Sequence, residues 1–501
     1  MSATREAVRR FEELQKSTSV THVPRPIPKV AKLQGRQIKT LADDIIETIL
    51  LGELEKIPQI VQSCQKPKED DICTAFQKSC SLKNVPASGM LLGEALALKV
   101  ASRCIDQACQ GKERAFTEEL LADNTPADVI KNLLKDAVAG SKLGLIEFLI
   151  KTHRNLIQTD AKLAQELLTL AIGQKCIPVI TLLLDNGASV TKSDSEGKQP
   201  LEVAVDSGEL AVVTFVCQKG ANVRWKDPKT GQTAMHRAAH SGFHQAILHL
   251  ASCRANVDEL DKEGKSALYV AVAAMSKEAV IALIEAGADI NNADSQGGVT
   301  RGQTPFLLAL EKGNDLIIDA LFNSGRLDFN KCDGKGTTPL IGAAKVGNAK
   351  ICSKLGQAEA AVNRRDSSGK TALYWAVLNG HAQVVKELVQ LGADPNIADQ
   401  NGQFPLLCAK SAAVVEQLLQ AKTIEIDKID PSGITALLQA TEKRRVDIVR
   451  LLVAASANYR KVCGGRLAVT PYFLAERAEN HEILAIFKNA DLQAVAETIK
   501  G

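Results

Sequence analysis

The chain has 501 residues, of which 45% are apolar and only 4% aromatic, which is enough apolar content to exclude disorder as its main state. Its 61 Lys and Arg residues nearly balance 58 Asp and Glu residues, so the net charge is +3. This balance gives no chain-wide field that would indicate nucleic acid or an anionic membrane as a partner. No apolar run reaches about 18 residues, so no membrane span is predicted.

The N-terminal sequence MSATREAVRRFEELQK alternates charged and apolar residues and lacks the features of a secretory signal. A cytoplasmic location is therefore expected. The twelve cysteines are scattered without a C-x-x-C pair, which argues against a zinc site or a disulfide framework. We expect most of them to be small buried residues.

Residues 1–40 are predicted to form a short helix followed by a basic extended arm. Residues 14–42 contain no acidic residue, and three prolines at alternate positions favour an extended chain. We expect this arm to dock on an acidic partner surface or on a cytoskeletal polymer such as a microtubule, and a solvated linker is the alternative. The cations expected to carry docking include Arg25, Lys29 and Lys32.

A related octet recurs eight times from residue 197 onward, as in GQTAMHRA, GQTPFLLA and GKTALYWA, at intervals of 31 to 38 residues. An aspartate precedes each octet glycine, and this pair favours a tight turn. The following Thr, with Pro or Ala after it, predicts a helix start. A small residue then allows close helix approach, and a second amphipathic helix covers the first. The octets begin at Gly197, Gly231, Gly264, Gly302, Gly336, Gly369, Gly402 and Gly433.

This pattern resembles the ankyrin repeat family, whose units begin Thr-Pro-Leu-His-x-Ala and recur about every 33 residues. The resemblance implies an all-α solenoid of stacked helix-turn-helix units with hairpin-like finger loops. VTPYFLA at 469–475 resembles a ninth start, and segments 135–150 and 168–190 resemble degenerate units. We therefore expect divergent helical repeats over 41–127 and an ankyrin array with a C-terminal capping repeat over 128–501. Extra residues after Asp294 predict one longer finger.

Signs of catalytic or metal chemistry are weak. The four-residue spacing of His236, His240 and His244 resembles a set of zinc ligands, but the ankyrin pattern itself places histidine at the first and third positions. SSGKT, ending at Thr371, resembles a phosphate loop but has Arg364 where the first glycine belongs. No hydrolase, zincin or kinase signature occurs. We expect no enzyme activity, metal or cofactor.

The resemblance implies partner binding along the fingers and the concave helical face, so we expect a non-enzymatic scaffold or adaptor. Two alternatives stay open: a structural component of a cytoskeletal or axonemal assembly, and an ankyrin effector of an intracellular microbe. The mixed polarity of the concave positions suits a folded protein partner. On the family pattern these positions are Asp206, Ser207, His240, Ser241, Glu311, Lys312, Lys345, Val346, Leu378, Asn379, Glu442 and Lys443.

The two tryptophans and two asparagines are further candidates for partner binding and for modification, respectively. Trp225, between Arg224 and Lys226, is either an exposed binding anchor or packed against the neighbouring finger, whereas Trp375 is expected to pack between units. The segments LIEAGADIN and LVQLGADPN resemble targets of asparaginyl hydroxylases. The residues that would be modified are Asn291 and Asn396, and ordinary inter-repeat loops are the favoured alternative.

Overall fold

The computed structural model describes residues 42, 44, 45, 60, 69–81, 88, 91, 127–293, 302–463 and 469–500, and their side chains except at 69–73, 81 and 494–500. The chain divides into two units, Met1–Val223 and Arg224–Gly501. The predicted basic arm and the long finger that begins at Asp294 lie outside the described residues.

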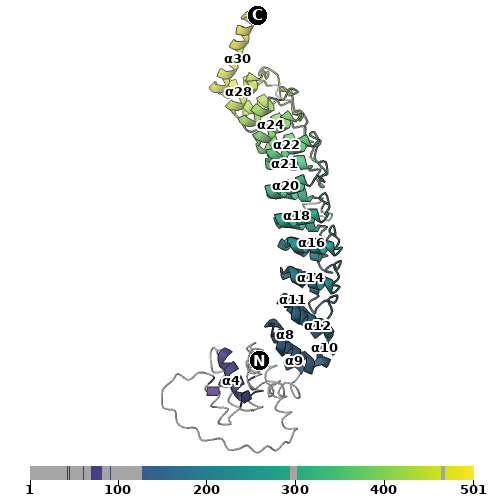
Figure 1. Cartoon of the computed structure of the whole chain (residues 1–501). Helices are drawn as coiled ribbons and strands as arrows, with labels where there is room; N and C mark the ends of the chain where they lie inside the picture. Colours follow the sequence, from purple (N-terminus) through teal and green to yellow (C-terminus); the bar gives the residue numbers. More distant parts are fainter. Residues whose placement is uncertain are drawn as a thin grey trace, which may run out of the picture. The chain divides into compact units, whose positions relative to one another are not determined.

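From residue 127 onward, the described part of the first unit consists of helices joined by turns and loops (Figure 1). In the segment predicted to hold divergent helical repeats, α4 is described. Further along, α8 contacts α9, α11 contacts α12, and α13 contacts α14, so the two segments expected to be degenerate units do form helix pairs. The helices are α4 (Glu69–Ser81), α8 (Ala127–Ala139), α9 (Leu143–Thr152), α10 (Arg154–Thr159), α11 (Ala161–Gly173), α12 (Ile177–Asp185), α13 (Pro200–Asp206) and α14 (Leu210–Gln218).

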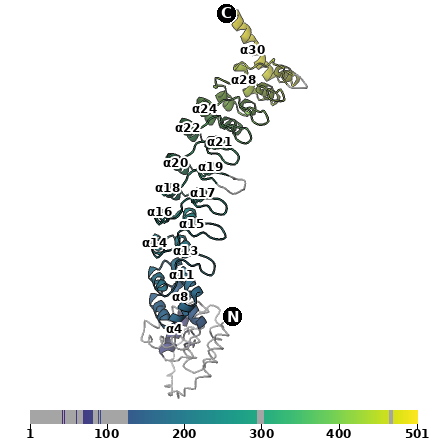
Figure 2. The same ribbon diagram turned by 90° about the vertical axis from the view of Figure 1, so that its right-hand side faces the viewer.

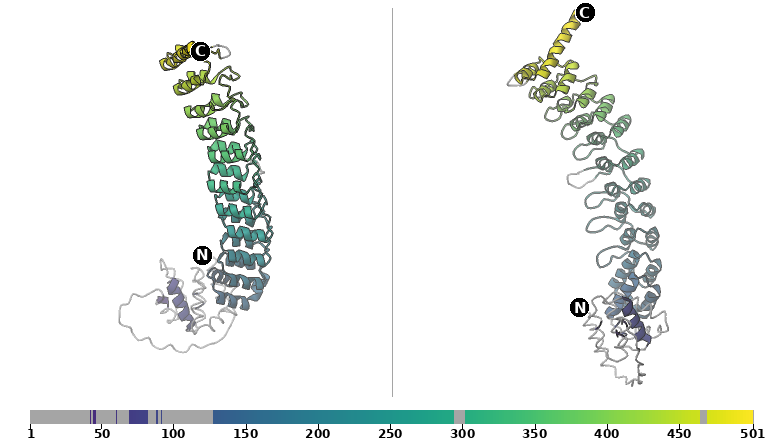
Figure 3. Two further views of the ribbon diagram at one scale, coloured as in Figure 1. Left: turned by 45° about the horizontal axis from the view of Figure 1, so that its top comes forward. Right: turned by 90° about the vertical axis from the view of Figure 1, so that its left-hand side faces the viewer.

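The second unit is a stack of helix pairs, with the finger loops on one side of the helices (Figures 2 and 3). Each odd-numbered inner helix from α15 to α27 contacts the next inner helix, and most even-numbered outer helices do the same. The helices are α15 (Ala234–Ser241), α16 (His244–Ser252), α17 (Ala267–Ala273), α18 (Lys277–Glu285), α19 (Pro305–Lys312), α20 (Asp315–Asn323), α21 (Pro339–Val346), α22 (Ala349–Gln357), α23 (Ala372–Asn379), α24 (Ala382–Gln390), α25 (Pro405–Cys408), α26 (Ala412–Leu418), α27 (Ala436–Glu442), α28 (Val446–Ala454), α29 (Pro471–Arg477) and α30 (His481–Lys500).

The predicted caps start the inner helices. The Thr371 hydroxyl accepts a hydrogen bond from the Tyr374 amide at 3.2 Å, and Thr338 and Thr435 make the same bond three residues onward. Thr470 likewise caps α29 within the ninth start. Phe404 has no such acceptor, and α25 in its repeat is only four residues long.

The small residues of the octets are buried between neighbouring inner helices, as expected. Each is at most 4% exposed, so a larger or charged side chain has no room without separating two repeats. The set comprises Ala204, Ala238, Ala271, Ala309, Ala343, Ala376, Ala409 and Ala440.

The finger turns are built on the predicted aspartates. Asp366 Oδ1 accepts hydrogen bonds from the amides of Ser368 and Lys370 at 2.9 and 3.0 Å, and its own amide donates to the Lys370 carbonyl. Successive fingers approach closely, because the Ser367 amide donates to the Lys335 carbonyl at 2.8 Å. Gly336 has a φ of +74°, and a Cβ there would lie 3.0 Å from the Ser367 nitrogen. This glycine is therefore required by both backbone conformation and space.

A second connection between repeats was not predicted. In the loops after the outer helices, an Asn or Asp side chain accepts a hydrogen bond from a backbone amide of the following repeat. We call this series the Asx ladder. Its steps are Asp258 to Asp289, Asn291 to Asp328, Asn330 to Ala361, Asn363 to Asp394, Asn396 to Glu425 and Asp427 to Asn458, all between 2.8 and 3.0 Å.

His236 has a structural role at the junction between its repeat and the next one. Its Nδ1 accepts from the Thr233 amide at 3.2 Å, so Nε2 carries the proton and donates to the Lys265 carbonyl at 3.0 Å. Burial lowers the pKa of His236. His240 is exposed and His244 half-buried. The bonds of His236 occupy both ring nitrogens and support the structural role over the zinc-ligand alternative.

Cysteine burial differs from the prediction. Of the eight cysteines whose side chains the structure describes, Cys80, Cys352 and Cys463 are buried and five are half-buried, so the expectation that most are buried is wrong for these eight. Burial raises the pKa of Cys352 to about 12, so its thiol is unreactive at neutral pH.

Ala376→Asp tests how far neighbouring repeats depend on one another. We expect unfolding to become easier by about 3–5 kcal/mol, because the substitution places an unpaired charge in a buried junction. Hydrogen exchange should rise in α21 and α25 as well as in α23. Gln390→Glu, which adds a charge at an exposed site on the outer helix of the same repeat, is the matched control. Faster exchange confined to α23 would contradict the expectation.

His236→Gln tests the hydrogen bonds that His236 makes to the Thr233 amide and, in the next repeat, to the Lys265 carbonyl. The folded-state pKa of His236 is lowered, so its contribution to stability is present above the unfolded pKa of about 6.5 and is lost as the pH falls through the folded value. Wild-type stability should therefore drop below pH 6.5 more steeply than that of the variant, as measured by denaturant unfolding. His240→Gln, at an exposed site, should retain the wild-type slope. Equal slopes for all three proteins would refute the assignment.

Candidate functional site

The predicted concave positions lie at the C-terminal ends of the inner helices. Asp206 on α13 belongs to the first unit and is exposed. In the second unit, three of these residues are exposed: His240 on α15, Glu311 on α19 and Glu442 on α27. Lys345 on α21 is half-buried. Leu378 on α23 is also half-buried. Because consecutive inner helices are in contact, the positions of the second unit form a row along one face.

The most organised part of this row surrounds Trp375. The Lys345 ammonium lies 4.3 Å from the centre of the indole ring, and the Lys370 ammonium lies 5.4 Å from it. The indole Nε1 donates to Asp366 Oδ2 at 2.8 Å. We call Lys345, Trp375 and Lys370 the Lys-Trp-Lys cluster. Trp375 is half-buried, so the prediction that it is a core residue packed between units is wrong; its indole lies partly open, beside the two lysines.

Two buried carboxylates support the cluster from beneath. Asp366 lies 3.9 Å from Lys345, and Asp399 lies 3.6 Å from Lys370. Burial would raise the pKa of Asp366, but hydrogen bonds from Ser368, Trp375 and two backbone amides hold it below its usual value. Burial lowers the pKa of Lys345. The cluster therefore keeps paired charges in a partly desolvated setting, in which further electrostatic contacts are stronger than in water.

Tyr374 ties the cluster to the next repeat. Its hydroxyl donates to Asp399 Oδ2 at 3.0 Å and also lies 3.0 Å from Cys408 Sγ. Burial, aided by these neighbours, raises the pKa of Tyr374, so the phenol stays protonated and can donate. It occupies the octet position where the ankyrin pattern has histidine, and it makes the same kind of contact with the following finger as His236.

The residues predicted around the first tryptophan are partly used within the protein. Lys226 forms an ion pair with Glu259, and Arg224 Nε donates to the Arg254 carbonyl at 3.5 Å. Trp225 is half-buried. The pair formed by Lys226 connects its finger to the next loop, so this residue has a structural role within the second unit besides the predicted one.

Asn291 and Asn396 are both members of the Asx ladder. The side-chain amide of Asn396 donates to the Thr423 carbonyl at 2.7 Å, and that of Asn291 donates to the Arg326 carbonyl at 2.8 Å. Each side chain thus makes two bonds to the following repeat. This arrangement supports the inter-repeat alternative, and hydroxylation stays a prediction that requires local opening of the loop.

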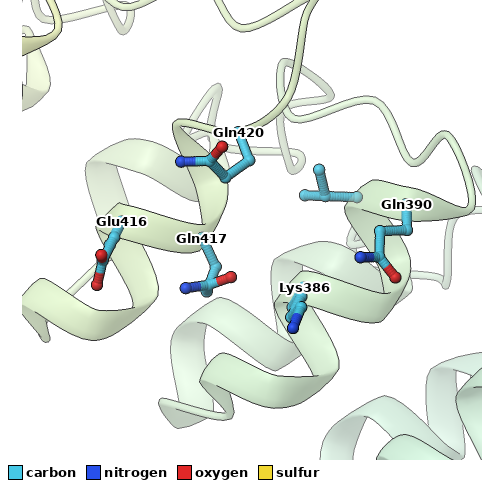
Figure 4. A pocket seen from close by; sticks show the side chains of 6 residues that line it. Lys386, Gln390, Glu416, Gln417 and Gln420 are labelled. Carbon is cyan, nitrogen blue, oxygen red and sulfur yellow. The ribbon is translucent and has the colours of Figure 1, made fainter.

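A polar groove lies on the outer helices, between α24 and α26 (Figure 4), with a cavity volume of about 300 Å³. It forms where α26 is shortened to seven residues. Amide groups and opposite charges line it, without a convergent set of catalytic groups: Lys386, Val389, Gln390, Glu416, Gln417 and Gln420. The octet positions did not indicate this groove.

None of the helices in the described part of the chain is both long and apolar enough to cross a membrane.

Similar proteins match the chain over part of its length. The chain is 32% identical over 164 residues to the nuclear factor NF-kappa-B p105 subunit of Gallus gallus, covering 32% of this chain and 16% of that protein. It is 30% identical over 210 residues to human palmitoyltransferase ZDHHC13, covering 40% and 32%. A Caenorhabditis elegans homologue of transient receptor potential channel subfamily A member 1 is 29% identical over 152 residues, covering 30% of this chain and 12% of the channel. The chain thus matches less than a third of the length of each of these relatives.

Among solved structures, the ankyrin repeat domain of Bcl-3, described as a unique member of the IkappaB family, is 26% identical, with a TM-score of 0.40. The match covers 44% of this chain and 98% of that domain. The family model for ankyrin repeats in three copies matches residues 134–227, 219–294, 306–399 and 385–463, which together make up more than half of the chain. The protein therefore belongs to the ankyrin repeat family, as an all-α solenoid.

Proposed function

We propose that the protein is a non-enzymatic scaffold or adaptor that binds partner proteins through its fingers and concave helical face. The observation that carries this proposal is the separation of roles within each repeat. Capping threonines, turn aspartates and buried alanines hold the stack together, whereas side chains such as Glu311 and Glu442 at the inner-helix ends face solvent. The concave row is therefore available for contact without unfolding the array.

The family supports the same proposal. Ankyrin repeats are generally protein–protein interaction modules, and the fold is typically non-enzymatic. The relatives are named as a channel homologue, a nuclear factor subunit and a palmitoyltransferase, so what they share with this chain is a repeat region and not one named activity. A cytoplasmic location is part of the proposal and rests on the sequence.

Substituting Leu378 tests the concave face. Leu378 and Val389 are half-buried aliphatic residues of one repeat, on the inner helix α23 and the outer helix α24 respectively. Leu378→Glu should reduce the amount of partner recovered by affinity purification at least tenfold, because it places a charge in the contact surface. Val389→Glu is the matched control and should retain binding. Cross-linking followed by mass spectrometry should place partner contacts on the inner helices.

Thermal unfolding of both variants should show equal stability, so that a loss of binding reports on the surface. Equal recovery of partners by both variants would contradict concave-face binding, as would cross-links concentrated on the outer helices. Recovery of no partner by the wild-type chain under native extraction would count against the adaptor function itself.

We propose that the basic arm adds a second, electrostatic contact with an acidic surface of a partner or of a cytoskeletal polymer. Substituting Arg25, Lys29 and Lys32 together with glutamine should weaken binding and reduce its dependence on salt, since exposed charges are screened over about 10 Å at 0.1 M. Glutamine at three exposed lysines of the array outside the concave row, Lys386, Lys422 and Lys488, is the control. Binding by the arm variant with the wild-type salt dependence would show that the arm does not take part.

A further inference from the structure

We propose that the concave face at α21 and α23 recognises an acidic segment of a partner protein, whose carboxylates bind Lys345 and Lys370 beside Trp375. This inference rests on the proposed function and adds the chemical class of the partner. It depends on the contacts of the Lys-Trp-Lys cluster, on what these side chains leave exposed, and on the charges beside them.

The lysine donors are only partly used within the protein. The Lys345 ammonium lies 3.3 Å from the Thr337 hydroxyl and 3.9 Å from Asp366, and the Lys370 ammonium lies 3.6 Å from Asp399. Both carboxylate distances exceed a normal charged hydrogen bond of about 2.7–2.9 Å. Each ammonium has three donors. Further acceptors can therefore bind without displacing the internal partners.

The cluster presents its positive side to solvent. The side chains of Lys345 and Lys370 are 27% and 19% exposed, whereas those of Asp366 and Asp399 are only 5% and 4% exposed. The acids are held beneath the surface by hydrogen bonds from Trp375 and Tyr374. An approaching group thus meets two ammonium ions that are each close to one indole ring, within about 10 Å of one another. A segment with two acidic side chains in close succession matches this spacing.

Neighbouring repeats extend the positive charge. Three exposed lysines lie at or just after the ends of inner helices: Lys312 at α19, Lys410 after α25 and Lys443 after α27. The acidic residues at the ends of these helices are Glu311 and Glu442. Cations thus outnumber acids along a row of a chain that is nearly neutral overall. A partner with several acidic residues would gain electrostatic attraction along this row.

Nucleic acid fits the same cluster less well. Binding of single strands uses aromatic faces on which bases stack. The ring of Trp375 already has the Lys345 ammonium 4.3 Å from its centre, where a stacked base would have to lie. Carboxylates on a flexible peptide need only the ammonium groups and can leave the ring covered. The observations therefore favour an acidic protein segment.

The test selects peptides from a random twelve-residue display library on the full 501-residue chain. Peptides eluted from the wild-type protein should be enriched in Asp and Glu. Synthetic copies of them should lose at least tenfold in affinity for the double variant K345Q/K370Q, measured by fluorescence anisotropy. The matched control is K277Q/K386Q, which removes two lysines from the outer helices α18 and α24 and should bind as the wild type does.

Further measurements separate the outcomes. Trp225→Phe leaves Trp375 as the only tryptophan, so its fluorescence should change on binding of acidic peptides. If the double variant does not fold, single substitutions K345Q and K370Q should each show part of the loss. Selected peptides without an excess of acids, acidic peptides that bind the double variant with wild-type affinity, or tighter binding of a single-stranded DNA oligonucleotide through the same lysines would overturn the inference.

Failure of this inference differs from failure of the proposed function. Neutral peptides that bind the wild type and are lost with Leu378→Glu would leave the adaptor function standing and refute the acidic partner. Absence of any selected peptide, together with recovery of no partner from native extracts, would count against both.

Discussion

Each helix pair of the array has an apolar face that only the next pair can cover, and the rest of the structure depends on this constraint. The buried octet alanines set how closely neighbouring inner helices approach. That approach brings the fingers near enough for backbone bonds between them, such as Ser367 to Lys335, and the loops near enough for the Asx ladder. Short-range turn chemistry and long-range stacking therefore stabilise the same junctions, as expected when no repeat is stable alone.

Much of the fold follows from the sequence because the octet combines a turn signal, a cap and a small residue at constant spacing. Thr371 caps its helix and Asp366 closes its turn, and both roles were predictable from residue type and position. The Asx ladder was not predictable in the same way, since its acceptor and its amide lie about thirty residues apart and either Asn or Asp serves. Its members could have been found only by aligning the loops after the outer helices, where such a residue recurs.

The surface was less predictable than the framework. The spacing correctly placed Lys345 and Leu378 at inner-helix ends, but it could not show that the Lys345 ammonium lies over Trp375. That contact depends on a long flexible side chain from the repeat of α21 and on the indole of the next repeat, which the finger aspartate Asp366 holds in place. Two successive repeats thus meet at one point. Contacts of this kind are set by the stack and are absent from any single repeat.

The same aspartate illustrates how framework and surface are joined. Asp366 closes a finger turn through its Oδ1, and through Oδ2 it holds the Trp375 indole beside the two lysines. The finger turn must therefore form before the cluster can take its geometry. A partner that contacts the cluster binds side chains already ordered by the fold, which lowers the entropy lost on association. Preorganisation of this kind would favour a partner whose charges match the cluster as the fold holds it.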